Sequence, residues 1–507
     1  MFKKLLAIIM ILPLLVCCKG NKTNPEPEVE PSIVVTGEKE VTLSCEGGSG
    51  SFTVTSNVNW KAEADDAWLT VTPDSGVASE TTVTVTYSCE RNPRVKNRST
   101  DIVISAPGAG KRVSVTQLGD PWSGAGEELH SGDVLQATNP LVEKFLTEVT
   151  YPDKTYSEYT KIFDYYGGFG GKVGDALTWD NWGKEWPDGD VPPQYSIRWT
   201  KEDLEDGVMT LHLEDALGWS GDLEIEAGAL YVNVTNLVPN DSYSYKVTAA
   251  GGKVIAQGTF TTIGTLHQCY FHGDHQKPNT KGGGGRNCRD FGGWTTLDGK
   301  TIKYRMVYRG GRLNEKWTPY PLNAQGEKEV LFEGIGAELD LRGNSDVMFT
   351  PAVEGLDHCA PVIEQGGKTM LVSDAAKTKE CFEFVVNSLR KGKPVHFHCS
   401  LGRDRTGTLG ILLFGILGVP EGDISKEYEL TYFAPVGYSV SSSDKKSNPT
   451  PTFKNTRMAW VYSDVAPYFW ELAGEGGTFK QGVEKYLREV AGVSQQDIDD
   501  FRSMMLE

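Results

Sequence analysis

Short runs in which apolar and polar residues alternate dominate residues 33 to 118. They include SFTVTSNVNW, TTVTVTY and RVSVTQ, and clusters of Gly, Pro, Asn and Ser separate them. Alternation with a period of two places the apolar side chains on one face of a strand, and short strands at this spacing are typical of a β-sandwich. The pattern therefore predicts an all-β module over residues 33–119.

Residues 120–265 are predicted to contain first a helix and then several strands. NPLVEKFLTEV predicts a helix, a Gly- and Trp-rich loop follows, and ALYVNVTNL, YSYKVTA and VIAQGTFTT predict strands. The run Leu237-x-Pro239-x-x-x-Tyr243 resembles a turn of fibronectin type III domains, in which the tyrosine hydroxyl ties a corner back to the backbone. This resemblance implies a second sandwich-like β region with a structural role.

The first module carries a resemblance of its own. Its residue order is similar to that of a BACON module: Asn57-x-x-Trp60, then Trp68-Leu69-Thr70-Val71-x-Pro73-x-x-Gly76, then Arg98 and Gln117. The resemblance implies a module that binds glycan or mucin, although it names no binding residue here. A spacer that lifts the next domain off the membrane is the alternative interpretation.

The first residues have the pattern of an export signal. Lys3 and Lys4 precede an apolar run of 12 residues from Leu5 to Val16, too short to cross a ~30 Å hydrocarbon core as a stable helix. The run ends at Cys17-Cys18 before the linker PEPEVEPS and resembles a bacterial lipobox with Cys18 as the lipidated residue. This implies a lipoprotein signal peptide over residues 1–18, a linker over 19–32, and a cell-envelope lipoprotein. Because no acidic run follows Cys18, we expect the periplasmic side rather than the outer surface.

Composition narrows the classes of partner. The 507 residues carry 68 acidic and 50 basic side chains, a formal charge of −18, which argues against nucleic acid because phosphate binding needs a basic face. The length is enough for about three or four folded units.

The cysteines after Cys18 are odd in number, so at least one thiol stays unpaired within the chain. Cys45 and Cys89 lie at predicted strand ends and are candidates for a disulfide.

The sharpest chemical signal is KPVHFHCSLGRDRTGTLGILLFGILG, residues 393–418. Val395 to Phe397 predicts a strand, and the small and apolar residues from Thr406 to Leu417 predict a helix. Five residues separate Cys399 from Arg405 between them. This spacing fits a loop whose backbone N–H groups point inward and hold a tetrahedral oxyanion, with the helix N-terminus adding positive potential.

The same loop predicts nucleophilic catalysis. Inward amides, a helix N-terminus and a guanidinium all favour the thiolate over a thiol whose reference pKa is about 8.5. We expect Cys399 to attack phosphorus and Arg405 to hold two non-bridging oxygens. The expected phosphate-binding residues are Ser400, Leu401, Gly402, Arg403 and Thr406. Among them, the glycine lets the backbone approach the phosphate, and the threonine hydroxyl can bond the departing sulfur.

HCSLGRDRTG resembles the phosphate loop of cysteine-dependent protein-tyrosine phosphatases, in particular an atypical bacterial branch that acts on phosphotyrosine, phosphoserine or threonine and phosphoinositides. Two further segments are similar to that branch: Asn287-Cys288-Arg289-Asp290-Phe291-Gly292-Gly293 with a strand ending in Tyr308-Arg309, and Glu338-Leu339-Asp340-Leu341-Arg342. The resemblance covers about residues 268 to 507. It implies an α/β cysteine-phosphatase domain over residues 266–507, with a central sheet flanked by helices.

Several aspartates compete for the role of general acid, which must reach the leaving oxygen and carry a proton. Asp404 lies inside the loop, where the atypical branch also carries and uses an aspartate. Asp340 is the second candidate, and its alternative role is to position an arginine. Asp374 is a substitute by position for a mobile acid loop. The segment Glu185-Trp186-Pro187-Asp188-Gly189 looks like such a loop, but its distance from the nucleophile in sequence favours an exposed turn.

Other residues near the motif have two interpretations each. Arg289, Arg309 and Arg342 either widen a positive substrate pocket or form surface ion pairs of little energetic value. His398 is expected to shape the loop by hydrogen bonding. Cys288 replaces the family's usual phenylalanine, and it either packs as a small apolar side chain or forms a reversible disulfide with the nucleophile.

Together these features predict two all-β sandwich-like modules followed by an α/β phosphatase domain, anchored to a membrane by lipid. The predicted reaction is hydrolysis of phosphate monoesters on phosphorylated protein or phosphoinositide through a cysteinyl-phosphate. The sequence shows no metal-ligand spacing, so neither metal nor other cofactor is expected. The alternatives are a phytase-like inositol-polyphosphate phosphatase and a glycan-binding surface lipoprotein whose phosphatase domain is secondary or inactive.

Overall fold

The computed structural model describes residues 30–94, 96–148, 189–204, 206–273, 284–314, 322–434 and 457–507. The chain divides into two compact units, Met1–Ser123 and Gly124–Glu507. The predicted signal peptide, its lipidation residue Cys18 and Asp188 lie outside the described residues.

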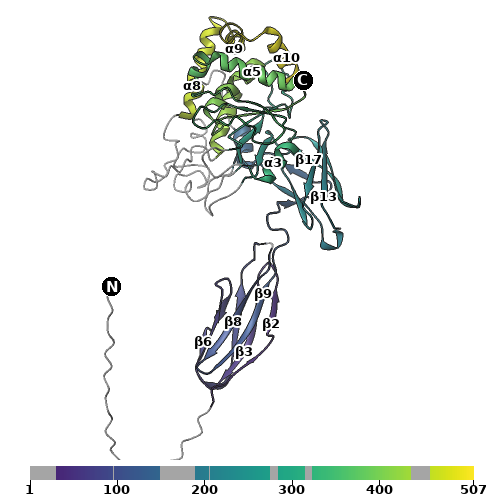
Figure 1. Ribbon diagram of the computed structural model, residues 1–507, viewed down its shortest axis with the longest axis vertical. Helices are drawn as coiled ribbons and strands as arrows, with labels where there is room; N and C mark the ends of the chain where they lie inside the picture. Colours follow the sequence, from purple (N-terminus) through teal and green to yellow (C-terminus); the bar gives the residue numbers. More distant parts are fainter. Residues whose placement is uncertain are drawn as a thin grey trace, which may run out of the picture. The chain divides into compact units, whose positions relative to one another are not determined.

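The first unit is built from two sheets, as the alternating pattern predicts. Their strands are shown in Figure 1. One sheet has the order β1 (Ile33–Thr36), β3 (Gly48–Ser56), β7 (Ser79–Cys89) and β5 (Thr70–Thr72). The other has the order β2 (Glu40–Leu43), β9 (Ala109–Gln117), β8 (Arg98–Ala106), β4 (Trp60–Ala64) and β6 (Ser75–Gly76).

A single hydrophobic core joins these two sheets. It takes Phe52 and Val54 from one sheet and Trp60, Ile102 and Val113 from the other. Every second residue is buried over residues 52–56 of β3 and 100–104 of β8. The two faces therefore form a β-sandwich. The cysteines of this unit are free thiols in the structure, so the predicted Cys45–Cys89 disulfide is absent.

The second unit begins with two further sheets and the predicted helix, α1 (Pro140–Glu148). The smaller sheet has the order β10 (Glu127–Glu128), β12 (Tyr195–Arg198) and β15 (Tyr231–Val234). The larger has the order β11 (Val134–Gln136), β17 (Val254–Ile263), β16 (Ser242–Ala249), β13 (Met209–Asp215) and β14 (Ser220–Ile225). Both contribute to one core, with Ile197 and Val232 from the smaller sheet packed among Leu211, Val247 and Phe260 from the larger.

The predicted tyrosine corner has its hydrogen bond. The buried Tyr243 hydroxyl accepts a hydrogen bond of 2.9 Å from the N–H of Val238, and burial raises its pKa. The bond closes the turn between β15 and β16, while membership of the fibronectin type III family stays a prediction.

The rest of the second unit surrounds a six-stranded sheet. Its order is β18 (Gln268–Phe271), β19 (Gly285–Asp290), β20 (Val307–Gly310), β23 (Val395–His398), β21 (Ala337–Asp340) and β22 (Asp357–Cys359). Strands β20, β23, β21 and β22 run parallel to one another, and β18, β19 and β20 are antiparallel. All residues of β23 are buried, as expected for a central strand covered on both faces.

Helices pack against this sheet, and Figure 1 shows α5, α8, α9 and α10 gathered in the C-terminal part of the unit. Their bounds are α3 (Ala324–Phe332), α4 (Lys368–Val372), α5 (Ala375–Arg390), α6 (Asp404–Leu417), α7 (Glu421–Glu429), α8 (Arg457–Ala473), α9 (Phe479–Lys485) and α10 (Gln495–Met505). Short 3₁₀ turns cover Lys201–Asp203 and Leu430–Phe433, and a π-helical turn covers Tyr486–Ala491.

Helix α6 is the central helix of this region. Every residue from Thr406 to Leu417 is buried, because its apolar side chains surround the axis instead of forming one stripe. The helix ends at Gly418, whose φ of 88° gives the left-handed cap that glycine favours. Within the described ranges, no helix combines the length and the apolar content needed to cross a membrane.

Candidate active site

The loop between β23 and α6 is a compact turn. Strand β23 ends at His398 and helix α6 begins at Asp404. Gly402 has a φ of +69°, and a Cβ placed on it would lie 2.4 Å from the carbonyl carbon of Gly310. Only glycine allows both this backbone conformation and this close approach to β20.

The carbonyl oxygens of the loop all point toward donors from the surrounding elements. Asn287 Nδ2 donates to the carbonyls of Leu401 (3.1 Å) and Gly402 (3.2 Å), Arg309 to that of Gly402 (2.9 Å), Arg312 to that of Ser400 (2.7 Å), and His398 Nδ1 contacts that of Cys399 (3.3 Å). In a peptide unit the N–H points away from the C=O. The donors around the loop therefore turn its N–H groups toward the inside.

Those inward N–H groups form an anion-binding cradle. Within the part of the chain that the structure describes, the N–H groups of residues 400–405 have no acceptor. The first N–H groups of α6 belong to this set, because the first turn of a helix has no intrahelical acceptor. Unpaired N–H groups at the start of a buried helix attract an oxyanion such as phosphate.

Cys399 is the first residue of this loop, and 2% of its surface is exposed. Burial by itself would raise the pKa of its thiol, but the charge of Arg405 and hydrogen bonds from the Thr406 hydroxyl and N–H outweigh it and lower the pKa to about 7. The Thr406 hydroxyl is buried and makes no hydrogen bond of ordinary geometry to any described residue, so it is available to the sulfur. A thiol with this pKa is about half ionised at neutral pH, which makes it a nucleophile.

Arg405 brings its guanidinium to the same place from the first turn of α6. It donates to the carbonyl of Ile363 at 3.0 Å, which fixes one side of its planar fork. The side chain is only half-buried. Its remaining donors can hold two oxygens of a tetrahedral anion.

Residues 281–507 match the family model described as "Tyrosine phosphatase family". The last part of this chain is thus similar to that family. A Cupriavidus necator protein named "Putative tyrosine-protein phosphatase" is 26% identical over 166 residues, which cover 28% of this chain and 59% of the relative. The chain thus spans less than two thirds of the length of that relative.

The first unit has a family match of its own. Residues 58–118 match the BACON family, described as "Putative binding domain, N-terminal". Similar solved structures include a Bacteroides ovatus GH5 xyloglucanase bound to a heptasaccharide, 16% identical over 22% of each chain with a TM-score of 0.17. A Caenorhabditis elegans MSP family member is 14% identical over 18% of this chain and all of its own, with a TM-score of 0.14. TM-scores of this size establish no shared fold.

The candidate acids around the loop have different surroundings. Asp404 pairs with the adjacent Arg403 through bonds of 2.9 and 3.1 Å, and 34% of its side chain is exposed. Asp340 is buried and bonded to Arg342 through both oxygens. Burial by itself would raise the pKa of Asp340, but His398 and Arg342 hold it below its ordinary value. Asp374 precedes α5 and pairs with Lys377 at 3.1 Å.

The arginines predicted to widen the substrate pocket have other roles in the structure. Arg289 and Arg309 each bond to Glu427 at 2.6 Å, and Arg342 pairs with Asp340 at 2.7 Å. Each of these guanidiniums has 3% or less of its side chain exposed. Because they are buried and paired, they neither line a pocket nor form surface ion pairs. The pairing is expected, since a buried guanidinium needs a carboxylate partner at close range.

Several residues around the loop carry functions that the motif alone does not reveal. Asn287, Arg312 and Glu338 are the main ones, the last through a 2.8 Å contact with His398 Nε2. Ser400 contacts the carboxylate of Asp346 through its hydroxyl. Asn287 has a φ of 58°, a left-handed conformation that asparagine tolerates better than most residues. The sequence signal for its role was a polar residue within a segment that forms a buried strand.

Cys288 has the packing role that was one of its two interpretations. It is 2% exposed, and burial raises its pKa to about 12. Its sulfur lies 3.6 Å from His396 and would collide with a Cβ on Gly310. A thiol with so high a pKa is a poor partner for thiol–disulfide exchange.

One group in the described residues has the chemistry of a metal site, namely His267, Cys269 and Glu333. Its polar atoms already have partners, however. The His267 ring nitrogens contact Asp290 and the carbonyl of Asn236, both at 2.9 Å. Glu333 accepts hydrogen bonds from Arg305 and from Tyr308. The positive guanidinium beside this carboxylate opposes a second cation, so we interpret the group as a buried hydrogen-bond network.

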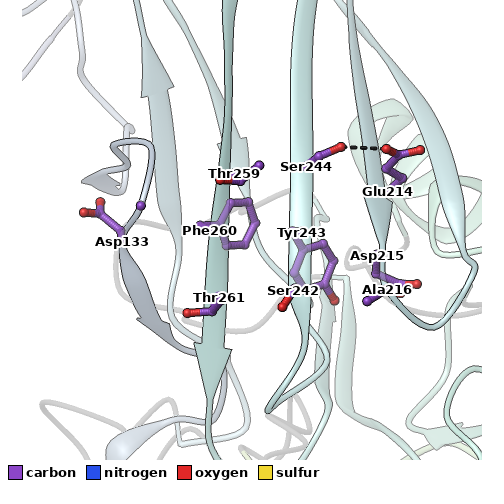
Figure 2. A pocket seen from close by; sticks show the side chains of 11 residues that line it. Asp133, Glu214, Asp215, Ala216, Ser242, Tyr243, Ser244, Thr259, Phe260 and Thr261 are labelled. Atoms are coloured by element: carbon purple, nitrogen blue, oxygen red, sulfur yellow. Dashed lines mark hydrogen bonds between the residues drawn. The ribbon is translucent and has the colours of Figure 1, made fainter.

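A separate pocket of about 430 Å³ opens on the larger sheet at the start of the second unit. Figure 2 shows Asp133 on one side of its lining and Glu214 and Asp215 on the other, with Ser244 donating to Glu214 at 2.7 Å. Its lining shares no residue with the loop at Cys399. The chemistry of nucleophile, cradle and guanidinium places the candidate active site at the loop.

Proposed function

We propose that the protein is a metal-independent phosphatase that hydrolyses phosphate monoesters through a cysteinyl-phosphate. The observation that carries this proposal is the buried thiol with a pKa of about 7 inside a ring of inward N–H groups. The family match and the relative's name support phosphotyrosine as a substrate. The substrate class also includes phosphoserine, phosphothreonine and phosphoinositide, because the loop binds only the phosphate group of the substrate.

The first chemical step is displacement at phosphorus. The Cys399 thiolate forms an S–P bond as the ester P–O bond breaks, and the leaving oxygen takes a proton from a general acid. Arg405 and the inward N–H groups bind the equatorial oxygens, whose charge they stabilise in the transition state. Water then attacks phosphorus, the S–P bond breaks, and the thiolate is restored as inorganic phosphate leaves.

Asp404 is the general acid that we propose. It lies at the start of α6, five residues from the nucleophile, with part of its side chain exposed to an incoming substrate. Asp340 is less suited because its lowered pKa keeps it ionised; we assign it the positioning of Arg342 instead. The Arg342 guanidinium donates three hydrogen bonds to Asp340 and also donates to Asn314 on the neighbouring loop.

The decisive experiment measures phosphate release from p-nitrophenyl phosphate by metal-free protein in EDTA. We expect turnover in the wild type and none in Cys399→Ser. Cys381→Ser is the matched control, because it removes another fully buried thiol, in α5, and should leave turnover unchanged. Turnover in Cys399→Ser would contradict the thiol mechanism.

A second experiment tests the acid. Asp404→Asn should lose much more activity on phenyl phosphate, a poor leaving group, than on p-nitrophenyl phosphate, and Asp340→Asn should show no such difference. A panel of phosphotyrosine peptide, phosphoinositide and phytate then selects the substrate class, phytate turnover favouring the inositol-polyphosphate alternative.

We also propose that lipid on Cys18 anchors the protein in the cell envelope, with its catalytic domain on the periplasmic side. The support is the apolar run before Cys17-Cys18 and the linker that follows. Membrane fractionation of Cys18→Ser, which should release the protein, tests this part.

For the first unit, the family match supports binding of a ligand, and a glycan array with residues 30–123 tests the glycan proposal.

A further inference from the structure

Asp190 lies outside the segment that matches the tyrosine phosphatase family, yet it contacts the residues that hold the phosphate loop. It is 5% exposed. Its carboxylate accepts hydrogen bonds from Arg286 at 2.9 and 2.5 Å, and from the backbone N–H of Asn287 at 2.8 Å. A buried carboxylate that accepts a bidentate guanidinium and a peptide N–H has a fixed position.

The backbone on both sides of Asp190 is anchored as well. Gln268 donates to the carbonyl of Gly189 at 2.7 Å, and Asn139 donates to the carbonyl of Val191 at 3.0 Å. A Cβ on Gly189 would lie 2.8 Å from the ring of Phe433, so this backbone packs directly against the domain. The position of Asp190 is therefore set by several elements of the second unit.

Asn287 connects Asp190 to the loop. Its φ of 58° lies in the left-handed region, where asparagine is one of the few tolerated residues. Its N–H bonds to Asp190, and its Nδ2 holds the carbonyls of Leu401 and Gly402. A change in the backbone of Asn287 would consequently turn the peptide units whose N–H groups face the anion.

We propose that Asp190 is a positioning residue of the phosphate loop. By holding the N–H of Asn287, it keeps that residue in the conformation that directs the loop carbonyls outward and the loop N–H groups inward. The inference rests on the proposed function, because it concerns the phosphate that this loop binds. It also makes the region before the matched segment a part of the catalytic unit.

The alternative is that Asp190 only neutralises Arg286. Both roles predict a loss of stability when the carboxylate is changed, so stability does not distinguish them. Only the positioning role predicts a change in the ionisation of Cys399 and in the binding of phosphate.

The test compares Asp190→Asn with the control Asp215→Asn in the full chain. Asp215 is also a buried carboxylate of the second unit, 9% exposed and paired with Arg305 at 3.2 Å, but it has no bond to Asn287. The pH dependence of iodoacetamide alkylation at Cys399, followed by mass spectrometry of its peptide, reports the thiol pKa. KM and kcat for p-nitrophenyl phosphate report binding and chemistry.

For Asp190→Asn we expect an alkylation midpoint shifted to higher pH and a KM raised about tenfold, with kcat changed less than about threefold, because phosphate binding is weakened more than the chemical step. Asp215→Asn should keep the wild-type midpoint and KM. If Asp190→Asn does not fold, Asp190→Glu retains the charge and should shift the midpoint in the same direction by less.

A double variant tests the route through Asn287. If Asp190 acts through it, Asn287→Ala and Asp190→Asn together should shift the midpoint no further than Asn287→Ala alone. Wild-type midpoint and KM in Asp190→Asn, or strictly additive shifts, would overturn the proposal. Alkylation needs no turnover, so an inactive wild type would refute the proposed function while leaving this result readable.

Discussion

Gly402→Ala is the sharpest perturbation of the loop, because the chain contains a glycine that controls for backbone strain. Gly402 and Gly392 share a φ of +69°. A Cβ on Gly402 would lie 2.4 Å from the carbonyl carbon of Gly310 and 2.6 Å from the nitrogen of Gly311, whereas a Cβ on Gly392 meets nothing within 4 Å. Both alanines bear the same left-handed strain, and only one of them collides.

The expected magnitudes follow from these distances. The left-handed conformation costs roughly 1–2 kcal/mol for alanine at either position. At Gly402 the contact is with backbone, which cannot rotate away, so the loop must move about 1 Å to reach an ordinary contact, and a displacement of that size in an active site can cost about 100-fold in rate. We therefore expect Gly402→Ala to lose about 100-fold in kcat/KM, and Gly392→Ala less than about twofold.

The assay is kcat/KM on p-nitrophenyl phosphate, with urea unfolding of each variant as the measure of stability. Comparable unfolding free energies together with very different activities would assign the loss to loop geometry. An active Gly402→Ala, within about threefold of wild type, would refute the close approach of the loop to β20. Equal activity losses in the two alanine variants would show that backbone strain alone matters.

Four further results are expected. Alkylation of Cys399 should rise with pH to a midpoint near 7, since its pKa is lowered to about 7, and a midpoint at the ordinary value of 9.0 would contradict the cradle. Because the folded pKa is the lower one, the ionised thiolate adds stability above pH 9, and this contribution is lost as the pH falls through about 7, which denaturation at several pH values can measure. Thr406→Val should move the alkylation midpoint upward, and an unchanged midpoint would exclude the hydroxyl as a cause. Glu427→Gln should cost roughly 3–5 kcal/mol in urea unfolding, because it removes the carboxylate shared by the buried Arg289 and Arg309; a loss below about 1 kcal/mol would refute that pairing.

Local patterns were sufficient for much of the fold. The period-two runs of residues 33–118 predicted the strands of the first unit, and NPLVEKFLTEV predicted α1 almost to the residue. These elements depend on side chains that are close in sequence, so their pattern is visible there. The predicted Cys45–Cys89 disulfide is absent although the backbone near the two cysteines comes together, with Gln117 donating to the carbonyls of Cys45 and Glu90. A disulfide also needs a specific side-chain geometry, which a strand pattern does not encode.

The arginines near the loop show why the surroundings of the candidate site could not be predicted from the sequence. Arg289, Arg309 and Arg342 were expected to face a substrate or solvent, since a guanidinium in sequence carries no sign of its partner. Glu427 lies in α7, which comes after the loop in the sequence, and the fold places it between Arg289 and Arg309. Burial then converts what would be weak surface charges into strong buried ion pairs, and Arg309 also donates to the carbonyl of Gly402 in the loop.

The sequence by itself determined the groups that we propose react, because Cys399, Arg405 and the helix after them belong to one short segment whose spacing dictates its geometry. Only the tertiary structure decided what surrounds that segment. Asn287 arrives from β19, Arg309 from β20, and Asp190 from ahead of the matched domain. They meet there because the order of strands in a sheet is set by packing of the whole unit, which no local pattern of residues encodes.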